Sequence, residues 1–385
     1  MNGFELLLTE EEIMIRDSAR AFAEEKVRPL AKKIDHEHYF PKELLPELSK
    51  MGFMGVCVDS AYGGSGLSSL AYALIIEELS RVCASTSVIV SAHNSLALWP
   101  IEHFGTEQQK LRYLPDMTSG KSIGCFALSE PGTGSDAARQ TCLARKDGSN
   151  WIITGVKNWI TNAPVSDVCV VFTMNDVQAG HKGITAFIVD LKTTKGVSIG
   201  KHEEKLGICG SPTASIILDE VVVSDDARLG EVGEGFKIAM GTLDGGRIGI
   251  AAQALGIAEA AFGDALRYSG ERKTFGQFLH QHQSIQNYLA DMSTEIEAAR
   301  LLTLVAARKK DKKMPYTKEA AQAKLYASEM ANSVAHKALQ IHGGYGYVKE
   351  FNVERYFRDA KITEIYEGTS EIQRIVIAGQ LIKGL

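Results

Sequence analysis

The sequence lacks the features that mark membrane-spanning and nucleic-acid-binding proteins. No uninterrupted apolar run approaches the roughly 20 residues that cross a bilayer, so no membrane span is expected. The 385 residues carry a formal net charge of −5 and a pI near 6.1, without an excess of basic residues. This balance argues against a nucleic-acid partner, and the basic run at residues 308–313 is better explained as a solvated helix end or loop.

Paired cysteines are also absent. The six cysteines are scattered, with no C-x-x-C pair and no cluster of histidines beside them. We therefore expect no structural zinc, predict no metal ligands and infer a reducing compartment. The first residues, MNGFELLLTEEE, are acidic and resemble neither a signal peptide nor an Arg-rich transit peptide. The expected location is the mitochondrial matrix if the chain is a processed eukaryotic one, and the cytoplasm otherwise.

Prolines are few, and no internal repeat or Pro/Ser-rich linker divides the chain. Three patterns nevertheless follow one another. Residues 1–120 show helical spacing of apolar residues, residues 121–230 contain short β-rich runs such as VCVVFTM and GITAFIVDL, and residues 231–385 return to helical spacing in Ala- and Leu-rich stretches. We predict three domains with these bounds, in a mostly α fold with a central β domain. Without linkers, the three regions are expected to share interfaces.

Two local signals sharpen the N-terminal region. Thr9, followed three residues later by Glu12, predicts a capping box at the start of the first helix. Breaks in the helical pattern are expected at Pro41, Pro46, residues 62–66 and Pro100.

One carboxylate stands out near the C-terminus. The segment at residues 362–379, ITEIYEGTSEIQRIVIAG, places Glu367 between a tyrosine and a glycine, among apolar and small residues that indicate an enclosed site. Burial disfavours the charged form of a carboxyl and raises its pKa toward working pH, as a base that takes a weakly acidic proton requires. The alternative is an exposed residue at a helix start, and spacing alone favours that alternative.

Two stretches carry a resemblance to a known family. ITEIYEGTSEIQR, at residues 362–374, and TLDGGRIGIAAQALGIAEAA, at residues 242–261, resemble the acyl-CoA dehydrogenases, and most of all their short-chain (butyryl-CoA) branch. The resemblance implies an N-terminal helical domain, a middle β-barrel or sandwich and a C-terminal four-helix bundle. It also implies FAD-dependent α,β-dehydrogenation of a short-chain acyl-CoA to the trans-2-enoyl-CoA. Glu367 would take the α-proton, and flavin N5 would accept the hydride.

The branch of the family depends on where the base stands. In the isovaleryl and long-chain branches it precedes the arginine of an LDxER-like segment, and the equivalent position here is Gly246, which excludes those branches. By resemblance, the backbone N–H of Glu367 polarises the thioester carbonyl. Asp244 and Arg247 would hold substrate or brace the base, and their alternative is a solvated i,i+3 ion pair. The residues assigned to substrate binding are Ser135, Asp244, Arg247, Tyr366 and Gly368.

A cofactor is implied by the same resemblance. Residues 132–137 fit G-x-G-x-x-A, but no clear helix follows them and residue 152 is Ile rather than an acid, so a Rossmann site is rejected. FALSEPGTGSDAA and KNWITN instead resemble the family's two flavin segments and imply non-covalent FAD. Taken alone, Trp159 would be a core aromatic residue of the β domain. The residues assigned to the flavin are Phe126, Leu128, Ser129, Trp159, Thr161, Thr369 and Glu371. Those assigned to its ADP end are Arg272, Thr274, Phe275 and Gln283, supplied by a neighbouring subunit, and Gln340, Gly343 and Gly344.

The resemblance further implies a homotetramer, built as a dimer of dimers, that works in fatty-acid β-oxidation and passes electrons to electron-transferring flavoprotein. Three alternatives stay open at this point. The substrate could be a short branched acyl-CoA such as isobutyryl- or 2-methylbutyryl-CoA, the enzyme could be an acyl-CoA oxidase, or the chain could keep the fold without turnover.

Overall fold

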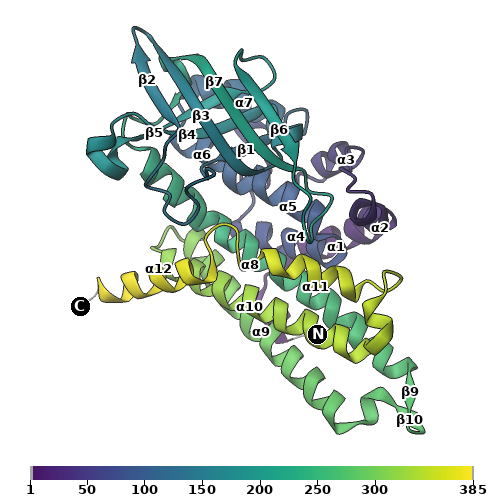
Figure 1. The fold of residues 1–385 in the computed structure, drawn as a ribbon. Helices are drawn as coiled ribbons and strands as arrows, with labels where there is room; N and C mark the ends of the chain where they lie inside the picture. Colours follow the sequence, from purple (N-terminus) through teal and green to yellow (C-terminus); the bar gives the residue numbers. More distant parts are fainter. Residues whose placement is uncertain (1–2, 384–385) are drawn as a thin grey trace.

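In the computed structural model, which describes residues 3–383, the strands of the middle region gather at one end, and the rest of the molecule is helical apart from one short hairpin at the opposite end (Figure 1). This confirms the prediction of a mostly helical fold with a central β region. The helices that precede the strands are α1 (Glu10–Phe22), α2 (Arg28–His36), α3 (Leu44–Lys50), α4 (Ser69–Val82), α5 (Ala84–Ala92), α6 (Trp99–Phe104) and α7 (Glu107–Thr118). Within residues 3–383, no helix combines the length and hydrophobicity that a membrane crossing demands.

The capping box predicted for the first helix is confirmed. The Thr9 N–H donates to Glu12 Oε2 at 2.9 Å, and the Glu12 N–H donates to Thr9 Oγ1 at 3.2 Å. These two bonds satisfy donors that the first turn of a helix leaves without a partner. Helix α1 therefore begins at Glu10, immediately after the predicted cap.

Two of the breaks expected at prolines are absent. Pro46 lies in the first turn of α3, where a backbone N–H has no intrahelical partner to lose. Pro100 lies in α6, which continues α5 through the π-helical segment η4 (His93–Leu98). There the N–H of Trp99 donates to the carbonyl of Asn94, five residues back. This wider turn directly precedes Pro100, so the helical run continues to Phe104.

The middle of the chain forms an eight-stranded sheet of order β6-β7-β3-β2-β4-β5-β8, with β1 paired in parallel to β4. Its strands are β1 (Gly124–Ala127), β2 (Leu143–Asp147), β3 (Asn150–Thr161), β4 (Val168–Met174), β5 (Ile184–Asp190), β6 (Val197–His202), β7 (Thr213–Ser224) and β8 (Arg228–Leu229). On β4, Val170 and Phe172 pack toward α7 and α8, whereas Cys169 and Val171 face a second core shared with β3 and β7. A strand buried on both faces reads as a continuous apolar run, as VCVVFTM does.

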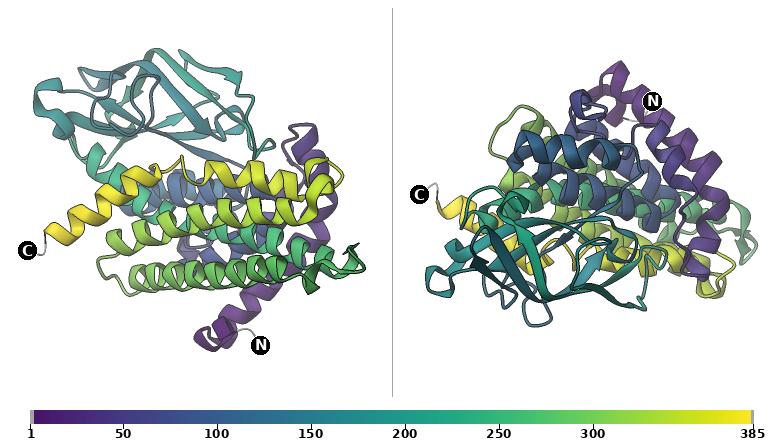
Figure 2. Two further views of the ribbon diagram at one scale, coloured as in Figure 1. Left: turned by 60° about the horizontal axis from the view of Figure 1, so that its bottom comes forward. Right: turned by 90° about the horizontal axis from the view of Figure 1, so that it is seen from above.

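The C-terminal region consists of long helices that run side by side (Figure 2). Its elements are α8 (Gly235–Glu271), β9 (Lys273–Thr274), β10 (Gln277–Phe278), α9 (Gln283–Asp311), α10 (Thr317–His342), α11 (Val353–Ile362) and α12 (Ser370–Ile382). One hydrophobic core joins α1 and α4 to α8, α9 and α10, so these helical regions share an interface as expected. Gly256 of α8 permits the approach of α4, because a Cβ there would collide with the Glu77 carbonyl.

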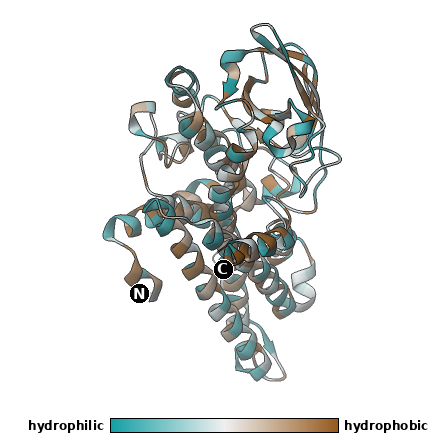
Figure 3. Ribbon diagram, turned by 90° about the vertical axis from the view of Figure 1, so that its left-hand side faces the viewer, coloured by the Kyte–Doolittle hydropathy of each residue, from teal (hydrophilic) through white to brown (hydrophobic). Residues whose placement is uncertain are grey.

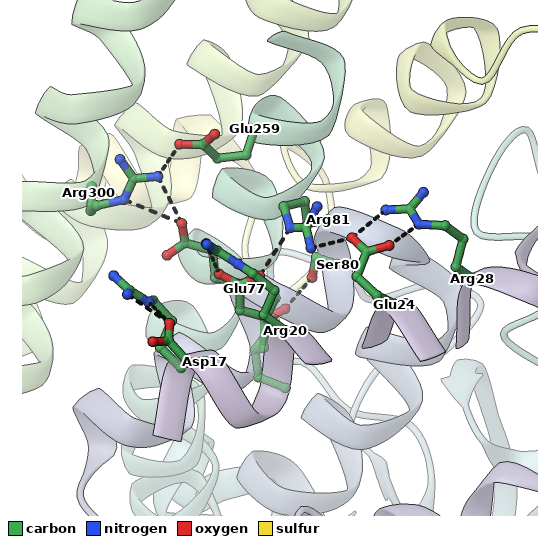
Figure 4. Close-up of polar contacts among 12 residues, drawn as sticks. Asp17, Arg20, Glu24, Arg28, Glu77, Ser80, Arg81, Glu259 and Arg300 are labelled. Carbon is green, nitrogen blue, oxygen red and sulfur yellow. Dashed lines mark hydrogen bonds and ion pairs between the residues drawn. The ribbon is translucent and has the colours of Figure 1, made fainter. Parts of the chain in front are cut away.

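Charged side chains bridge α1, α4 and α9 (Figure 4). Glu78, whose side chain is 3% exposed, accepts from Arg20 at 2.7 Å and from Arg81 at 3.0 Å. Arg300 of α9 donates to Glu77 of α4 at 2.9 Å. Because each buried carboxylate meets a guanidinium, these helices are fixed in register without leaving an unpaired charge in the interior.

The basic run at residues 308–313 is not a freely solvated helix end. Arg308 donates to both carboxylate oxygens of Glu12, at 2.5 and 2.7 Å. The carboxylate of Asp311 accepts the backbone N–H of Ser69 at 2.6 Å, at the N-terminus of α4. Negative charge at that position satisfies a free backbone donor and complements the helix dipole. The run therefore anchors the end of α9 to the N-terminal helices.

Candidate active site

Glu367 lies in the turn between α11 and α12, on the side of the helical region that faces the strands (Figure 1). Its φ is +52°, and that of Gly368 is +92°. The left-handed region costs a residue with a side chain about 1–2 kcal/mol, so the surroundings must hold this turn. One such restraint is the Ser370 N–H, which donates to the Glu364 carbonyl at 3.0 Å.

The carboxylate of Glu367 is enclosed although part of the residue reaches solvent. Its Oε2 is buried and has no hydrogen-bond partner among residues 3–383. Burial raises the pKa of Glu367 to about 7, against the opposing positive charges of Lys324 and Arg247. The alternative of an exposed residue at a helix start therefore does not hold.

The apolar residues around Glu367 in the sequence do not form the enclosure. Ile365 is 50% exposed and Ile375 is 66% exposed, so this part of the expectation was wrong. Helices α8 and α10 enclose the carboxylate instead, because they bring Gly246 and Lys324 to the turn from distant parts of the chain.

Gly246 of α8 lies directly against the carboxylate. A Cβ built on Gly246 would collide with Glu367 Oε2 and would lie 3.1 Å from the Leu96 side chain. The structure thus brings together the two positions at which the resembled family's motifs place a base, and of the two only the turn position carries a carboxylate.

Asp244 and Arg247 form an ion pair beside Glu367 that is shielded from solvent. Their side chains are 16% and 5% exposed, and Arg247 Nη1 donates to Asp244 Oδ1. The other oxygen, Asp244 Oδ2, accepts from the Thr317 hydroxyl at 2.6 Å. The alternative of a solvated pair is therefore excluded, and the guanidinium is held where its charge acts on Glu367.

Tyr366 and Gly368 are tied down by residues that the sequence analysis missed. The Tyr366 hydroxyl donates to the side-chain oxygen of Gln253, whose nitrogen donates to the Ala84 carbonyl at 3.1 Å. The Gly368 carbonyl accepts from Lys324 Nζ at 2.8 Å. A signal for Lys324 was present, because its spacing from Ala320 and Ala327 places it on the alanine-rich buried face of α10.

The backbone of the turn leaves one donor free. Among residues 3–383, the N–H of Glu367 has no hydrogen-bond partner. A free N–H beside a buried carboxylate can bind the oxygen of a carbonyl whose neighbouring carbon loses a proton.

The two predicted flavin segments lie side by side. The Asn158 N–H donates to the Ser129 carbonyl at 2.8 Å, which joins β3 to the loop after β1. Trp159 stands at a register shift in β3 with φ +61°, and its side chain is 61% exposed. It is therefore not a core aromatic residue. The strand after β1 is β2, with no helix between them, as the rejection of a Rossmann site requires.

This surface fits a flat aromatic group. The exposed indole of Trp159, the half-buried ring of Phe126 and the half-buried Thr161 belong to adjacent segments of one sheet. Indole and phenyl faces pack on planar rings, and the hydroxyl offers a hydrogen bond. Leu128 is buried in the core against which Phe126 packs, and Thr369 caps α12 close to Glu367.

The residues predicted for the ADP end lie elsewhere. Arg272 and Phe275 belong to the hairpin of β9 and β10, at the end of the long helices away from the sheet (Figure 1). Arg272 lies over the ring of Tyr345 at 5.7 Å, which places the hairpin beside the loop after α10. That hairpin and its surroundings contain Thr274, Gln283, Gln340, Gly343 and Gly344. This chain therefore does not bring its two sets of predicted cofactor residues together.

Ser135 and Glu371 are among the predicted residues that are exposed. Ser135 lies in the loop between β1 and β2, and Glu371 lies in the first turn of α12. A cavity of about 630 Å³ between α7 and the segment after β7 is lined by none of the predicted site residues. The buried charged groups of the site thus lie on the turn at Glu367 and on helices α8 and α10.

Comparisons with known proteins agree with this geometry. The N-terminal, middle and C-terminal domains of acyl-CoA dehydrogenase match residues 9–121, 125–221 and 233–382. The chain is 52% identical over 376 residues to the mitochondrial short-chain specific acyl-CoA dehydrogenase of Bos taurus, covering 98% of this chain and 91% of that protein. It is 45% identical over 379 residues to the caffeyl-CoA reductase-Etf complex subunit CarC of Acetobacterium woodii, covering 98% of this chain and 100% of that one. The structure of butyryl-CoA dehydrogenase from Megasphaera elsdenii matches with a TM-score of 0.95 and 46% identity, over 97% of this chain and 99% of that one. The chain belongs to the acyl-CoA dehydrogenase family.

Proposed function

We propose that this chain catalyses the α,β-dehydrogenation of a short-chain acyl-CoA such as butyryl-CoA to the trans-2-enoyl-CoA. The observation that carries the proposal is the buried Oε2 of Glu367, which has no hydrogen-bond partner among residues 3–383 and belongs to a carboxyl whose pKa is about 7. Such a group takes a proton near neutral pH. The names of the Bos taurus relative and the Megasphaera elsdenii structure support the short-chain substrate.

The residues of the turn and its neighbours have separate roles in the reaction. Glu367 takes the proton from Cα, and the electron pair of that bond becomes the double bond as a hydride leaves Cβ. The free N–H of Glu367 donates to the thioester oxygen and stabilises the negative charge that develops there. Arg247, held by Asp244, adds to the charge of Lys324 in favouring the ionised form of the carboxylate against the effect of burial. Tyr366 and Gly368 shape the substrate side of the turn, and Ser135 reaches the CoA portion.

The reaction needs a bound cofactor, because no side chain can accept a hydride. Bound FAD would supply the acceptor for the hydride from Cβ. The residues that would hold its ring non-covalently are Phe126, Leu128, Ser129, Trp159, Thr161, Thr369 and Glu371.

The ADP end requires a second copy of the chain. We propose that Arg272, Thr274, Phe275 and Gln283, with Gln340, Gly343 and Gly344, serve a cofactor held by a neighbouring subunit in a homotetramer. Two features support this assembly. Phe275 is 98% exposed, and hydrophobic residues lie on the exposed α12 beside the C-terminus (Figure 3). Side chains of this kind are normally covered in an assembly.

The partner, location and domain bounds complete the proposal. Electron-transferring flavoprotein is the proposed acceptor, supported by the name of the Acetobacterium woodii relative. The proposed location is the mitochondrial matrix for a processed eukaryotic chain and the cytoplasm otherwise. Domain bounds near residues 120 and 230 are testable by limited proteolysis.

The test of the base is Glu367→Gln. FAD-loaded protein is mixed anaerobically with butyryl-CoA, and the flavin absorbance is followed. The variant should bind butyryl-CoA but reduce its flavin about 10²- to 10⁴-fold more slowly. Glu329→Gln, which alters an exposed carboxylate of α10 that pairs with Arg374, is the control and should react like the natural chain. Reduction of Glu367→Gln at the natural rate would refute the assigned base, and a natural chain that no acyl-CoA bleaches would refute the function.

A second candidate function is the reverse reaction, reduction of a 2-enoyl-CoA, which the name of the reductase relative favours. A substrate panel separates the candidates. Butyryl-, isobutyryl- and 2-methylbutyryl-CoA are tested for flavin bleaching, crotonyl-CoA is tested for reoxidation of the reduced enzyme, and air is then admitted. Fast bleaching by butyryl-CoA with slow reoxidation by air supports the dehydrogenase. Fast reoxidation by air identifies an oxidase.

A further inference from the structure

Lys324 of α10 is a buried cation that the reaction outlined above does not use. Its side chain is 0% exposed and lies on the alanine-rich inner face of the helix. The ammonium donates to the Gly368 carbonyl at 2.8 Å, and within residues 3–383 it forms no direct ion pair with a carboxylate. Burying an ammonium costs several kcal/mol unless charge or hydrogen bonds compensate, so one neutral carbonyl does not account for a lysine here.

The missing compensation comes from Glu367. Burial lowers the pKa of Lys324 to about 8, and Glu367 is the foremost charge that opposes this effect. In the same way, Lys324 is the foremost charge that opposes the burial of Glu367. Each group therefore lessens the cost of burying the other, although no hydrogen bond joins them.

The hydrogen bond of Lys324 also orients the turn. The Gly368 carbonyl accepts a second bond, from Gln373 Nε2 at 2.8 Å, and the same nitrogen lies 3.3 Å from the Glu367 carbonyl. The Gly368 carbonyl thus meets donors on α10 and α12, and the Glu367 carbonyl meets a donor on α12. The N–H of Glu367 is left without a partner among the residues described.

We propose that Lys324 is a positioning residue, whose ammonium holds the Gly368 carbonyl in the left-handed turn and whose charge favours the ionised form of the Glu367 carboxylate. The inference rests on the proposed function for the role of Glu367 as base. The other titratable and charged groups that face the pair are Arg247 on α8, Tyr72 on α4, and Tyr366, Glu364 and Glu371 on the turn and α12. These groups stay in place in the variants below, so any change reports on Lys324.

Two variants separate charge from hydrogen bonding. Lys324→Gln keeps a donor for the Gly368 carbonyl and removes the charge, whereas Lys324→Met removes both. The matched control is Lys337→Met on the same helix, where the lysine pairs with Glu295 at 3.0 Å. If Lys324→Met fails to fold, Lys324→Gln still tests the charge.

The first readout does not depend on turnover. The C=O stretch of protonated Glu367 is recorded by infrared difference spectroscopy in the FAD-loaded protein without substrate, assigned by its loss in Glu367→Gln, and titrated with pH. Loss of a neighbouring positive charge should raise the midpoint by about one pH unit or more in both variants, with no change in the control. A purely structural role would leave the midpoint in place, and an unmoved midpoint in Lys324→Gln would overturn the proposal.

The second readout is the pH dependence of flavin reduction by butyryl-CoA. Below the natural midpoint, Lys324→Gln should react about tenfold more slowly for each pH unit by which the midpoint rises, and it should recover above the raised midpoint. Lys324→Met should recover less, because its turn is not held. Full recovery of Lys324→Met would refute the orienting role. If no acyl-CoA reduces the flavin but the infrared midpoint still rises, the proposed function fails while the coupling of Lys324 to Glu367 stands.

Discussion

Gly246→Ala adds one methyl group at the most crowded point of the site. Its Cβ would overlap Glu367 Oε2, and it would lie 2.9 Å from the Cδ of the same side chain and 3.1 Å from Leu96 Cδ2. Carbon atoms at their best separation are about 3.5–4.0 Å apart. The carboxylate must therefore move by roughly 1 Å to relieve the overlap. This displacement carries the base away from the position in which it would meet the α-proton.

The expected effect on stability is small, because two changes oppose one another. Alanine in a helix interior is favoured over glycine by about 0.5–1 kcal/mol, whereas overpacking of a filled site costs about 1–3 kcal/mol. The net loss is therefore about 0–2.5 kcal/mol. The effect on rate is larger, because a misplacement of about 1 Å lowers a positioned reaction about 100-fold.

The assay compares anaerobic flavin reduction by butyryl-CoA with thermal unfolding of the same preparations. Gly263→Ala, in the same helix, is the control, since nothing lies within 4 Å of a Cβ there. The control should keep its rate and gain about 0.5–1 kcal/mol of stability. If Gly246→Ala reduces its flavin within about threefold of the natural rate, the argument from positioning fails.

Three further predictions test other parts of the site. Because burial raises the pKa of Glu367 to about 7 and the base must be ionised, flavin reduction should speed up as pH rises to about 7 and level off above it; a profile that is flat through neutral pH would contradict this assignment. Trp159→Ala should leave the unfolding temperature nearly unchanged, because the indole is 61% exposed. It should lower the amount of FAD that copurifies, measured as the flavin-to-protein absorbance ratio. An undiminished ratio would exclude the indole from the cofactor site. Lys157→Met removes the cation that pairs with the buried carboxylate of Glu130 at 2.8 Å. The free energy of unfolding, measured by chemical denaturation, should fall by about 3–5 kcal/mol. Lys201→Met, which replaces a lysine whose side chain is 87% exposed, should leave it almost unchanged.

The sequence predicted those features whose causes are local. The capping box at Thr9 requires only two residues in one turn, and the helical and β-rich regions follow from the spacing of apolar residues. The continuation of the helix through Pro100 was not predictable, because a π-helical turn upstream accommodates the proline. Residue type alone suggests a core aromatic residue at position 159, because the register shift that exposes Trp159 depends on pairing with β7.

The candidate site was only partly predictable, because its enclosure comes from residues far apart in the chain. Glu367 and Gly246 could each be picked out by motif, but their contact depends on the packing of α8 against the turn. Lys324 carries no motif, and although its spacing places it on the buried face of α10, its bond to Gly368 depends on the packing of α10 against the turn. Local sequence patterns contain no information on such contacts until the helices are placed.

The contact between Gly246 and Glu367 also defines a rule of mutual exclusion. Two carboxylates cannot occupy this volume together, because even a methyl group on α8 overlaps the one that is present, and two like charges so close could not both ionise. A family member with its base on α8 must therefore give up the large acidic side chain at the turn position. Transfer of the base from one position to the other requires two coordinated substitutions, since either one alone would leave the volume doubly filled or without a base.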